Sequence, residues 1–262
     1  MNTKPAMLLL LLLAGPAQAQ PNDPVQHYRD RVADFEAENR DDLEPGVRHV
    51  VLVGDSMIEG WNDRRIDSYL PSVAERVLNR GIVSDRVGPP RGVLSRMDSS
   101  IFDTRPSHVV LLVGVNQIGR DGSGVDGAAR QYRQVLDQIK ARLPNVPVIV
   151  VTVPPTRGGY DALNPHIRRF NDLIKGHARA LRHPVLDLHA RLAGPDGRLR
   201  RDLSVDGLHF NTRGYSLFGQ DLERLIPSSA GATGGSSAPV IPRGMSEAPA
   251  SRGAAGRLGD GF

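Results

Sequence analysis

The sequence contains no cysteine in its 262 residues. This absence excludes disulfides, thiolate chemistry, cysteine-ligated zinc and the attachment of lipid to an N-terminal cysteine. The fold must therefore be held together by its core alone. A chain of this length, 39% hydrophobic and 24% charged, is long enough to bury one sizeable core and still carry appendages.

Lysine and aromatic residues are also scarce. Lysine occurs only at positions 4, 140 and 175, so arginine supplies nearly all of the basic charge behind a net charge of +4 and a pI of about 9.7. The arginines are spread along the chain and interleaved with acidic residues, a pattern more typical of solvated helix surfaces than of a patch for an anionic polymer. Aromatics make up 5% and form no stacking motif, so no nucleic-acid partner is expected.

Only the N-terminus has an apolar run that could be confused with a membrane span. Lys4 precedes the run Met7 to Ala14, and small residues up to Ala19 follow it. This is the pattern of a signal peptide, and the run is well short of the roughly 20 apolar residues that a membrane-spanning helix needs. We expect residues 1–19 to be removed after Ala19. The protein is then exported, to the periplasm or out of the cell, with no stable membrane anchor after cleavage.

Two further segments flank the expected domain. Residues 20–46 are polar, with a helical pattern over 27–39, and are expected to form an extension on the outside of the domain. Residues 227–262 are rich in Gly, Ser, Ala and Pro and have few large apolar side chains, so they are expected to be a disordered tail. Residues 47–226 remain as the domain itself.

Within residues 47–226, short apolar runs alternate with segments of helical periodicity. This alternation predicts βαβ units, and therefore an α/β fold with a five-stranded parallel sheet and helices on both faces. The predicted strands are 50–53, 76–81, 109–113, 148–153 and 184–188, and the main predicted helices are 92–102, 127–143, 165–181 and 212–225.

Three polar or glycine positions follow strands of this sheet: Ser56, Gly81 and Asn116. Open parallel sheets bind ligands at the carboxyl ends of their strands, where a late loop with Asp206 and His209 can also fold back. Acyl transfer needs a nucleophile, a base, a group that orients the base, and donors for the oxyanion. We assign these roles to Ser56, His209 and Asp206, with the oxyanion held by the N–H groups of Ser56 and Gly81 and the amide of Asn116.

Four motifs resemble, in order, the sequence blocks of the SGNH (GDSL) hydrolases. They are Gly54-Asp55-Ser56, Asn79-Arg80-Gly81-Ile82, Gly114-Val115-Asn116 and Asp206-Gly207-Leu208-His209-Phe210-Asn211. The segment Gly92 to Asp98 is further similar to the branch of platelet-activating-factor acetylhydrolase. The resemblance implies a flavodoxin-like three-layer α/β/α fold, esterase or lipase chemistry without cofactor or metal, and the same site roles. Gln117 stands where the family usually has aspartate, and the loop after Gly81 lacks the usual second glycine.

The expected function is that of an exported serine esterase acting on small acyl esters, above all O-acetyl groups on carbohydrate. One alternative is a lysophospholipase or short-chain lipase, although no long apolar lid stands out in the sequence. The other is a non-catalytic carbohydrate-binding or cell-surface module on the same fold, which the altered loop after Gly81 would suit. Trp61 and Phe210 are expected in the core, and Asp85 at most positions its loop.

Overall fold

The computed structural model describes residues 23–61, 66, 68–119, 122 and 124–226. The expected signal peptide, 1–19, and the expected tail, 227–262, lie outside the described residues. No helix in the described part of the chain is long and apolar enough to span a membrane.

Five parallel strands form one sheet in the order β2-β1-β3-β4-β5, which confirms the predicted fold class. The strands are β1 (His49–Gly54), β2 (Val77–Gly81), β3 (Pro106–Leu112), β4 (Val148–Val151) and β5 (Val185–Leu186). Every residue of β1 is buried, because β1 has a strand on each side and helices over both faces. The apolar run of the sequence is therefore the centre of the molecule.

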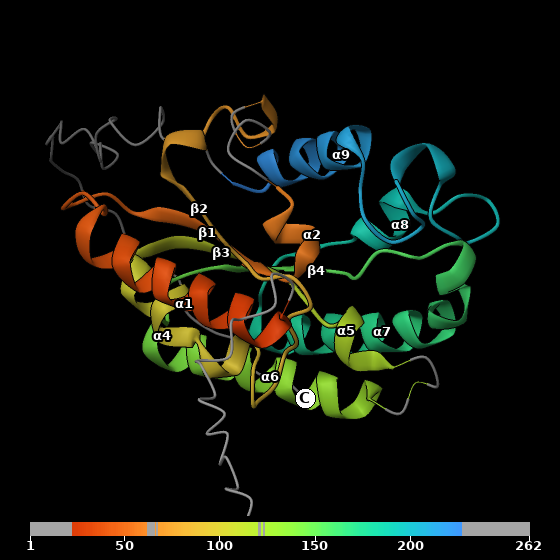
Figure 1. Ribbon diagram of the computed structural model, residues 1–262, viewed down its shortest axis with the longest axis horizontal. Coiled ribbons are helices and arrows are strands. Elements are labelled where there is room, and N and C mark those ends of the chain that lie inside the picture. The colour runs from red at the N-terminus through yellow and green to blue at the C-terminus, as the bar shows by residue number, and fades with distance from the viewer. Residues whose placement is uncertain (1–22, 62–65, 67, 120–121, 123, 227–262) are drawn as a thin grey trace, which may run out of the picture. The chain divides into compact units, whose positions relative to one another are not determined.

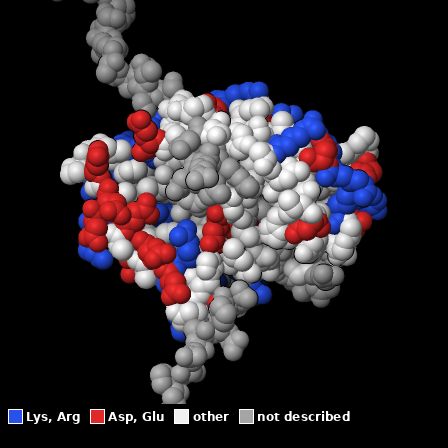
Figure 2. All heavy atoms as spheres, turned by 45° about the horizontal axis from the view of Figure 1, so that its top comes forward, with Lys and Arg blue, Asp and Glu red and all other residues white. Residues whose placement is uncertain are grey.

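Helices cover the sheet in two layers (Figure 1). One layer contains α1 (Pro24–Asp41), α4 (Met97–Ser100), α5 (Val115–Ile118), α6 (Val125–Arg142) and α7 (Asn164–Leu181). The other contains α8 (Leu188–Leu192) and α9 (Thr212–Glu223). Helices α6 and α7 each bury one apolar face, whose residues recur at helical spacing. Tyr132 of α6 packs edge-on against Phe170 of α7, with ring centroids 5.9 Å apart. On the face shown in Figure 2, acidic side chains gather mainly on the left and lysine and arginine side chains mainly on the right.

Helix α1 is more closely integrated with the domain than the expected extension 20–46 implied. It begins at an Asp23 N-cap that accepts from the N–H of Val25 at 2.8 Å. Phe35 on its inner face is 1% exposed, with the guanidinium carbons of Arg31 and Arg80 at 4.7 and 4.8 Å from its ring centroid. Phe35, the one buried residue of the helix, thus packs α1 onto the domain.

The expected helix over 92–102 is wrong as a single element. The structure has a 3₁₀ turn at Val93–Ser95, the one-turn helix α4, and a second 3₁₀ turn at Phe102–Thr104. Val93, Met97 and Ile101 are buried, as the spacing of four requires, but Arg96 has φ −132° and interrupts the helix between the first two turns. Consecutive single turns can present the same spacing as a continuous helix, so the periodicity alone does not separate the two.

The neighbouring strands β2, β1 and β3 end together at one edge of the sheet. Gly54, the last residue of β1, is in register with Gly81 of β2 and Leu112 of β3. A Cβ on Gly54 would lie 2.1 Å from the carbonyl oxygen of Leu112, so only glycine allows this close packing. The segments that follow these three strands are therefore brought side by side.

Candidate active site

Ser56 lies immediately beyond β1, as the first residue of the one-turn helix α2 (Ser56–Glu59). Asp55 caps this helix, and its Oδ1 accepts from the N–H of Met57 at 3.1 Å. The helix begins directly after the strand, because β1 ends at Gly54 and the one residue between them, Asp55, is an N-cap in extended conformation. The serine side chain is thereby held at the sheet edge, half-buried.

A chain of two hydrogen bonds joins three of the predicted residues. Oγ of Ser56 lies 3.0 Å from Nε2 of His209, which is 153 positions further along the chain. Nδ1 of the same ring lies 2.7 Å from Oδ2 of Asp206. This is the geometry that a hydroxyl, a base and an orienting carboxylate need for nucleophilic catalysis.

The loop that carries Asp206 and His209 is fixed by its own hydrogen bonds. Oδ1 of Asp206 accepts from the N–H groups of Leu208 and His209, at 2.9 and 2.8 Å. Gly207 has φ +94°, and a Cβ there would lie 2.3 Å from the carbonyl oxygen of Arg157. The N–H of Arg157 donates to the carbonyl of Gly207 at 2.8 Å. Only glycine fits this turn, which aims the imidazole at Ser56.

The carboxyl group of Asp206 stays ionised over a wide pH range. Partial burial raises its pKa, but the hydrogen bonds from the His209 ring and from the N–H groups of His209 and Leu208 outweigh this effect. The net result is a pKa below the ordinary value. A negative charge is therefore available beside Nδ1 of His209 at neutral pH.

Asn116 lies in the one-turn helix α5, just beyond β3, at the same sheet edge. Its Nδ2 donates to the carbonyl oxygen of Asp85 at 2.9 Å, which leaves its second amide hydrogen without a partner among the described residues. Gln117, which stands where the family usually has aspartate, binds the loop after Gly81. Its Oε1 accepts from the N–H groups of Val87 and Gly88, both at 3.1 Å. The loop that departs from the family pattern is therefore held in place by Gln117, which also departs from it.

Gly81 does not match its expected role as an oxyanion donor. Its N–H donates to Oδ1 of Asn79 at 3.0 Å, so the single hydrogen is already used. A Cβ on Gly81 would lie 2.1 Å from the backbone nitrogen of Glu59, so this position is a glycine because α2 packs directly onto it. The sequence motif marks a close approach between backbones here.

The sequence analysis did not single out Ser84, three residues beyond Gly81 in the loop that follows β2. Ser84 has φ +62°, and its N–H has no partner among the described residues. On one side, the N–H of Val83 donates to the carboxylate of Glu59 in α2, and on the other the carbonyl of Asp85 accepts from Asn116. The signal in the sequence was the missing second glycine, since a left-handed residue is usually glycine.

Asp55 is a second acidic group beside the serine, and it is completely buried. Burial raises its pKa to about 7; the N–H of Met57 opposes this rise, the carboxylate of Asp85 adds to it, and His209 opposes it. Its Oδ2 has no hydrogen-bond partner among the described residues. Such a group is charged only with difficulty in the folded protein.

This burial predicts a pH-dependent stability difference between wild type and Asp55→Asn. Because the folded protein holds the proton up to about pH 7 and the unfolded chain releases it near 3.8, the group favours folding at low pH. Wild type should lose about 1–3 kcal/mol relative to the variant between pH 5 and pH 8, given about 1.4 kcal/mol per pKa unit. Urea unfolding of both proteins at the two pH values measures this. A difference that does not change with pH would contradict the assignment.

The remaining expectations concern residues outside the hydrogen-bonded group. Trp61 and Phe210 are 0% and 4% exposed and pack with Tyr215, as expected for core aromatics. Among the described residues, no group of three or more His, Asp or Glu side chains is arranged to hold a metal ion.

Comparison with known proteins identifies related folds. A structure from Streptococcus pneumonia, described as a platelet activating factor candidate, superposes with a TM-score of 0.67 at 19% identity, covering 77% of this chain and 93% of that one. A catalytic mutant of an acetylxylan esterase from Geobacillus stearothermophilus gives 0.55 at 15% identity, covering 70% and 94%. At these identities the likeness establishes the fold.

A curated protein sequence also matches this chain, over 213 residues. The N-acylneuraminate cytidylyltransferase of Escherichia coli is 22% identical over 213 residues, which is 79% of this chain and 46% of the relative. The chain therefore spans about half the length of that protein.

A family model matches residues 52–217, from β1 to the final helix, and so covers most of the described domain together with Ser56, Asn116 and His209. The model describes the GDSL-like lipase/acylhydrolase family. The chain belongs to this family of lipases and acylhydrolases.

Proposed function

We propose that the protein is an exported serine esterase that removes small acyl groups, O-acetyl groups on carbohydrate above all. One observation carries the proposal: the uninterrupted hydrogen bonding from Ser56 through His209 to Asp206, at 3.0 and 2.7 Å. A serine hydroxyl with no such base is a poor nucleophile at neutral pH.

The reaction follows from this geometry in two halves. As Oγ of Ser56 attacks the ester carbonyl, Nε2 of His209 takes its proton, and Asp206 stabilises the imidazolium. The imidazolium then protonates the leaving alcohol, and the acyl group stays on Ser56. Water enters, gives its proton to His209 and displaces the acyl group as acid, and the proton returns to Oγ.

The negative oxygen that forms in each half needs hydrogen-bond donors. We assign this role to three groups that have no other partner among the described residues: the N–H groups of Ser56 and Ser84 and the second amide hydrogen of Asn116. Such donors act strongly because they are held in place before the reaction begins. Ser84 takes the place that the sequence motif suggested for Gly81.

Three observations favour a polar alcohol of some size over a lipid. The side chains of His209 and Asp206 are 39% and 41% exposed, so the relay opens directly to solvent. The exposed large hydrophobic side chains among the described residues are only Val83, Val205 and Leu225. The names of two related proteins, an acetylxylan esterase and an N-acylneuraminate cytidylyltransferase, refer to sugars.

A cavity beside the loop that follows β2 and carries Ser84 supports the preference for a polar alcohol. It has a volume of about 230 Å³ and is lined by Tyr28 of α1 and by loop residues that include Ser84, Arg86 and Arg91. Both arginines are exposed. Hydroxyl and guanidinium groups suit a hydroxylated or carboxylated sugar better than an alkyl chain.

A substrate series tests the proposal with the wild-type protein. We expect hydrolysis of p-nitrophenyl acetate at least ten times faster, in kcat/KM, than that of the octanoate, and release of acetate from O-acetylated xylo-oligosaccharide or neuraminate. A preference for octanoate or for lysophospholipid would establish the lipase alternative instead. Absence of hydrolysis of every ester, with retained binding of carbohydrate, would favour the non-catalytic module.

A further inference from the structure

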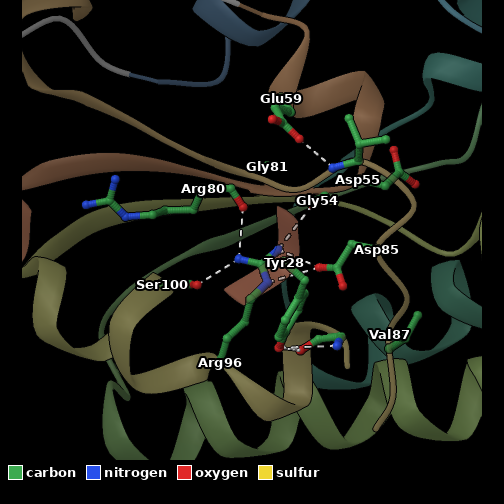
Figure 3. Close-up of polar contacts among 12 residues, drawn as sticks. Tyr28, Gly54, Asp55, Glu59, Arg80, Gly81, Asp85, Val87, Arg96 and Ser100 are labelled. Carbon is green, nitrogen blue, oxygen red and sulfur yellow. Dashed lines mark hydrogen bonds and ion pairs between the residues drawn. The ribbon is translucent and has the colours of Figure 1, made fainter. Parts of the chain in front are cut away.

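Arg96, between the first two of the three short turns that replace the expected helix, has a guanidinium that is 0% exposed. All five of its N–H donors are used (Figure 3). Nε and Nη2 donate to Oδ2 of Asp85 at 3.0 and 2.7 Å, and the carboxylate of Asp85 is equally buried. The other bonds reach the carbonyls of Gly54 and Arg80 and the hydroxyl of Ser100, at 3.1, 2.9 and 2.7 Å.

These partners belong to three separate parts of the site. Gly54 ends β1, two residues before Ser56, and Arg80 lies in β2, one residue before Gly81. Asp85 lies in the loop that follows β2, next to Ser84. One planar group therefore ties both strand ends to the loop that runs past them, at angles that the rigid guanidinium fork fixes.

Asp85 extends this connection to Asn116. While its carboxylate binds Arg96, its carbonyl oxygen accepts from Nδ2 of Asn116 at 2.9 Å. The two hydrogens of a planar amide diverge at a fixed angle, so the position of this carbonyl sets the direction of the second hydrogen. A shift of Asp85 would turn the free hydrogen of Asn116 away from its target.

Stability alone does not account for a charged pair at this place. Burying two ions costs desolvation energy, and apolar residues of similar volume often stabilise a fold as well or better. What apolar residues cannot do is bind two strand-end carbonyls and a loop carboxylate in fixed directions. Oδ1 of Asp85 even remains without a partner among the described residues, so the pair is not arranged for the greatest number of bonds.

We infer that Arg96 and Asp85 are positioning residues for the reaction, acting through Asn116 by fixing the direction of its free amide hydrogen. This inference rests on the proposed function. Neither side chain touches the substrate, so their loss should lower kcat and leave KM nearly unchanged.

The first test is Arg96→Lys with p-nitrophenyl acetate. Lysine keeps the buried positive charge opposite Asp85, but its single ammonium cannot reach all the partners of the guanidinium. We expect kcat to fall about 10- to 100-fold and KM to change less than about 3-fold, and Asp85→Asn should behave similarly. Glu38→Gln is the matched control, because it removes the carboxylate beside another buried guanidinium, Arg80, without touching the loop; its kcat should stay within about 2-fold of wild type.

A double-mutant cycle distinguishes positioning from a general loss of structure. Asn116→Ala removes one oxyanion donor and should lower kcat about 10²–10³-fold. If Arg96 acts through Asn116, Arg96→Lys should have little further effect in that background, within about 3-fold. Effects that multiply, or an unchanged kcat in Arg96→Lys, would overturn the inference, as would failure of both Arg96→Lys and Asp85→Asn to fold.

The proposed function and this inference fail in different ways. If wild type hydrolyses no ester, or if Ser56→Ala is as active as wild type, the proposed function is wrong. If Ser56→Ala is inactive while Arg96→Lys matches wild type, only the positioning role is wrong.

Discussion

Ser56→Ala is expected to hydrolyse p-nitrophenyl acetate about 10⁴- to 10⁶-fold more slowly than wild type. The variant has lost the only oxygen within hydrogen-bond distance of Nε2 of His209 among the described residues, 3.0 Å away. Water must then attack directly, helped only by the donors for the oxyanion and by substrate binding, which leave a small residual rate in serine hydrolases. The comparison requires only initial rates of p-nitrophenol release at matched protein concentration.

The fold should be unaffected by this change. Ser56 caps no helix, since Asp55 does so, and its hydroxyl makes one hydrogen bond. Thermal unfolding of the variant should therefore lie close to that of wild type. Ser95→Ala, at an exposed serine, serves as the control and should keep the full rate. A Ser56→Ala protein that is folded and retains more than a tenth of the wild-type kcat would show that another group attacks the ester.

His209→Ala should lower kcat by a similar factor. Without the imidazole, no other base among the described residues is hydrogen-bonded to Oγ of Ser56, and the ionised Asp206 has nothing to orient. In a relay of this kind the residues act as one unit, so their effects do not add. We expect the double variant Ser56→Ala, His209→Ala to be no slower than either single variant, as judged from initial rates with p-nitrophenyl acetate.

The control for His209 is a histidine remote from the relay. His177 lies on α7 in the layer of helices below the sheet (Figure 1), and His177→Ala should keep the wild-type rate. Strictly multiplicative losses in the double variant would mean that Ser56 and His209 contribute separately. The hydrogen bond between them would then not be a path for the proton.

The parallel sheet and the converging residues could be predicted because they depend on short-range patterns. Four consecutive apolar residues at Val50 to Val53 are typical of a strand that is buried on both faces, as in a parallel sheet covered by helices. Once the strands are parallel, Ser56 and Asn116 must follow strands that end at the same edge. The pairing of Asp206 with His209 needs only a turn of three residues.

The network around Arg96 could not be predicted, because its partners are far apart in sequence. The bonds from its guanidinium to Arg80, Gly54 and Asp85 span 16, 42 and 11 positions. In an amphipathic pattern an arginine is expected on the solvent-exposed face. The residues next to Arg96 in the sequence give no sign that its side chain is buried. The same pattern made the segment around it resemble a single helix.

The direction of a backbone N–H is equally hidden from the sequence. Gly81 matched the family motif, yet its hydrogen points at the side chain of Asn79, whereas the N–H of Ser84 has no hydrogen-bond partner among the described residues. The motif preserves the glycine because α2 lies against it. A matching residue therefore locates the loop without showing which of its backbone hydrogens is free to bind an oxyanion.

Labelling with a fluorophosphonate probe, followed by peptide mapping, tests the central claim most directly, because such probes react with a serine only when a base activates it. The account predicts one adduct, on the peptide that contains Ser56, in wild type but not in His209→Ala. An adduct on any other serine, or none on a protein that still hydrolyses esters, would contradict it.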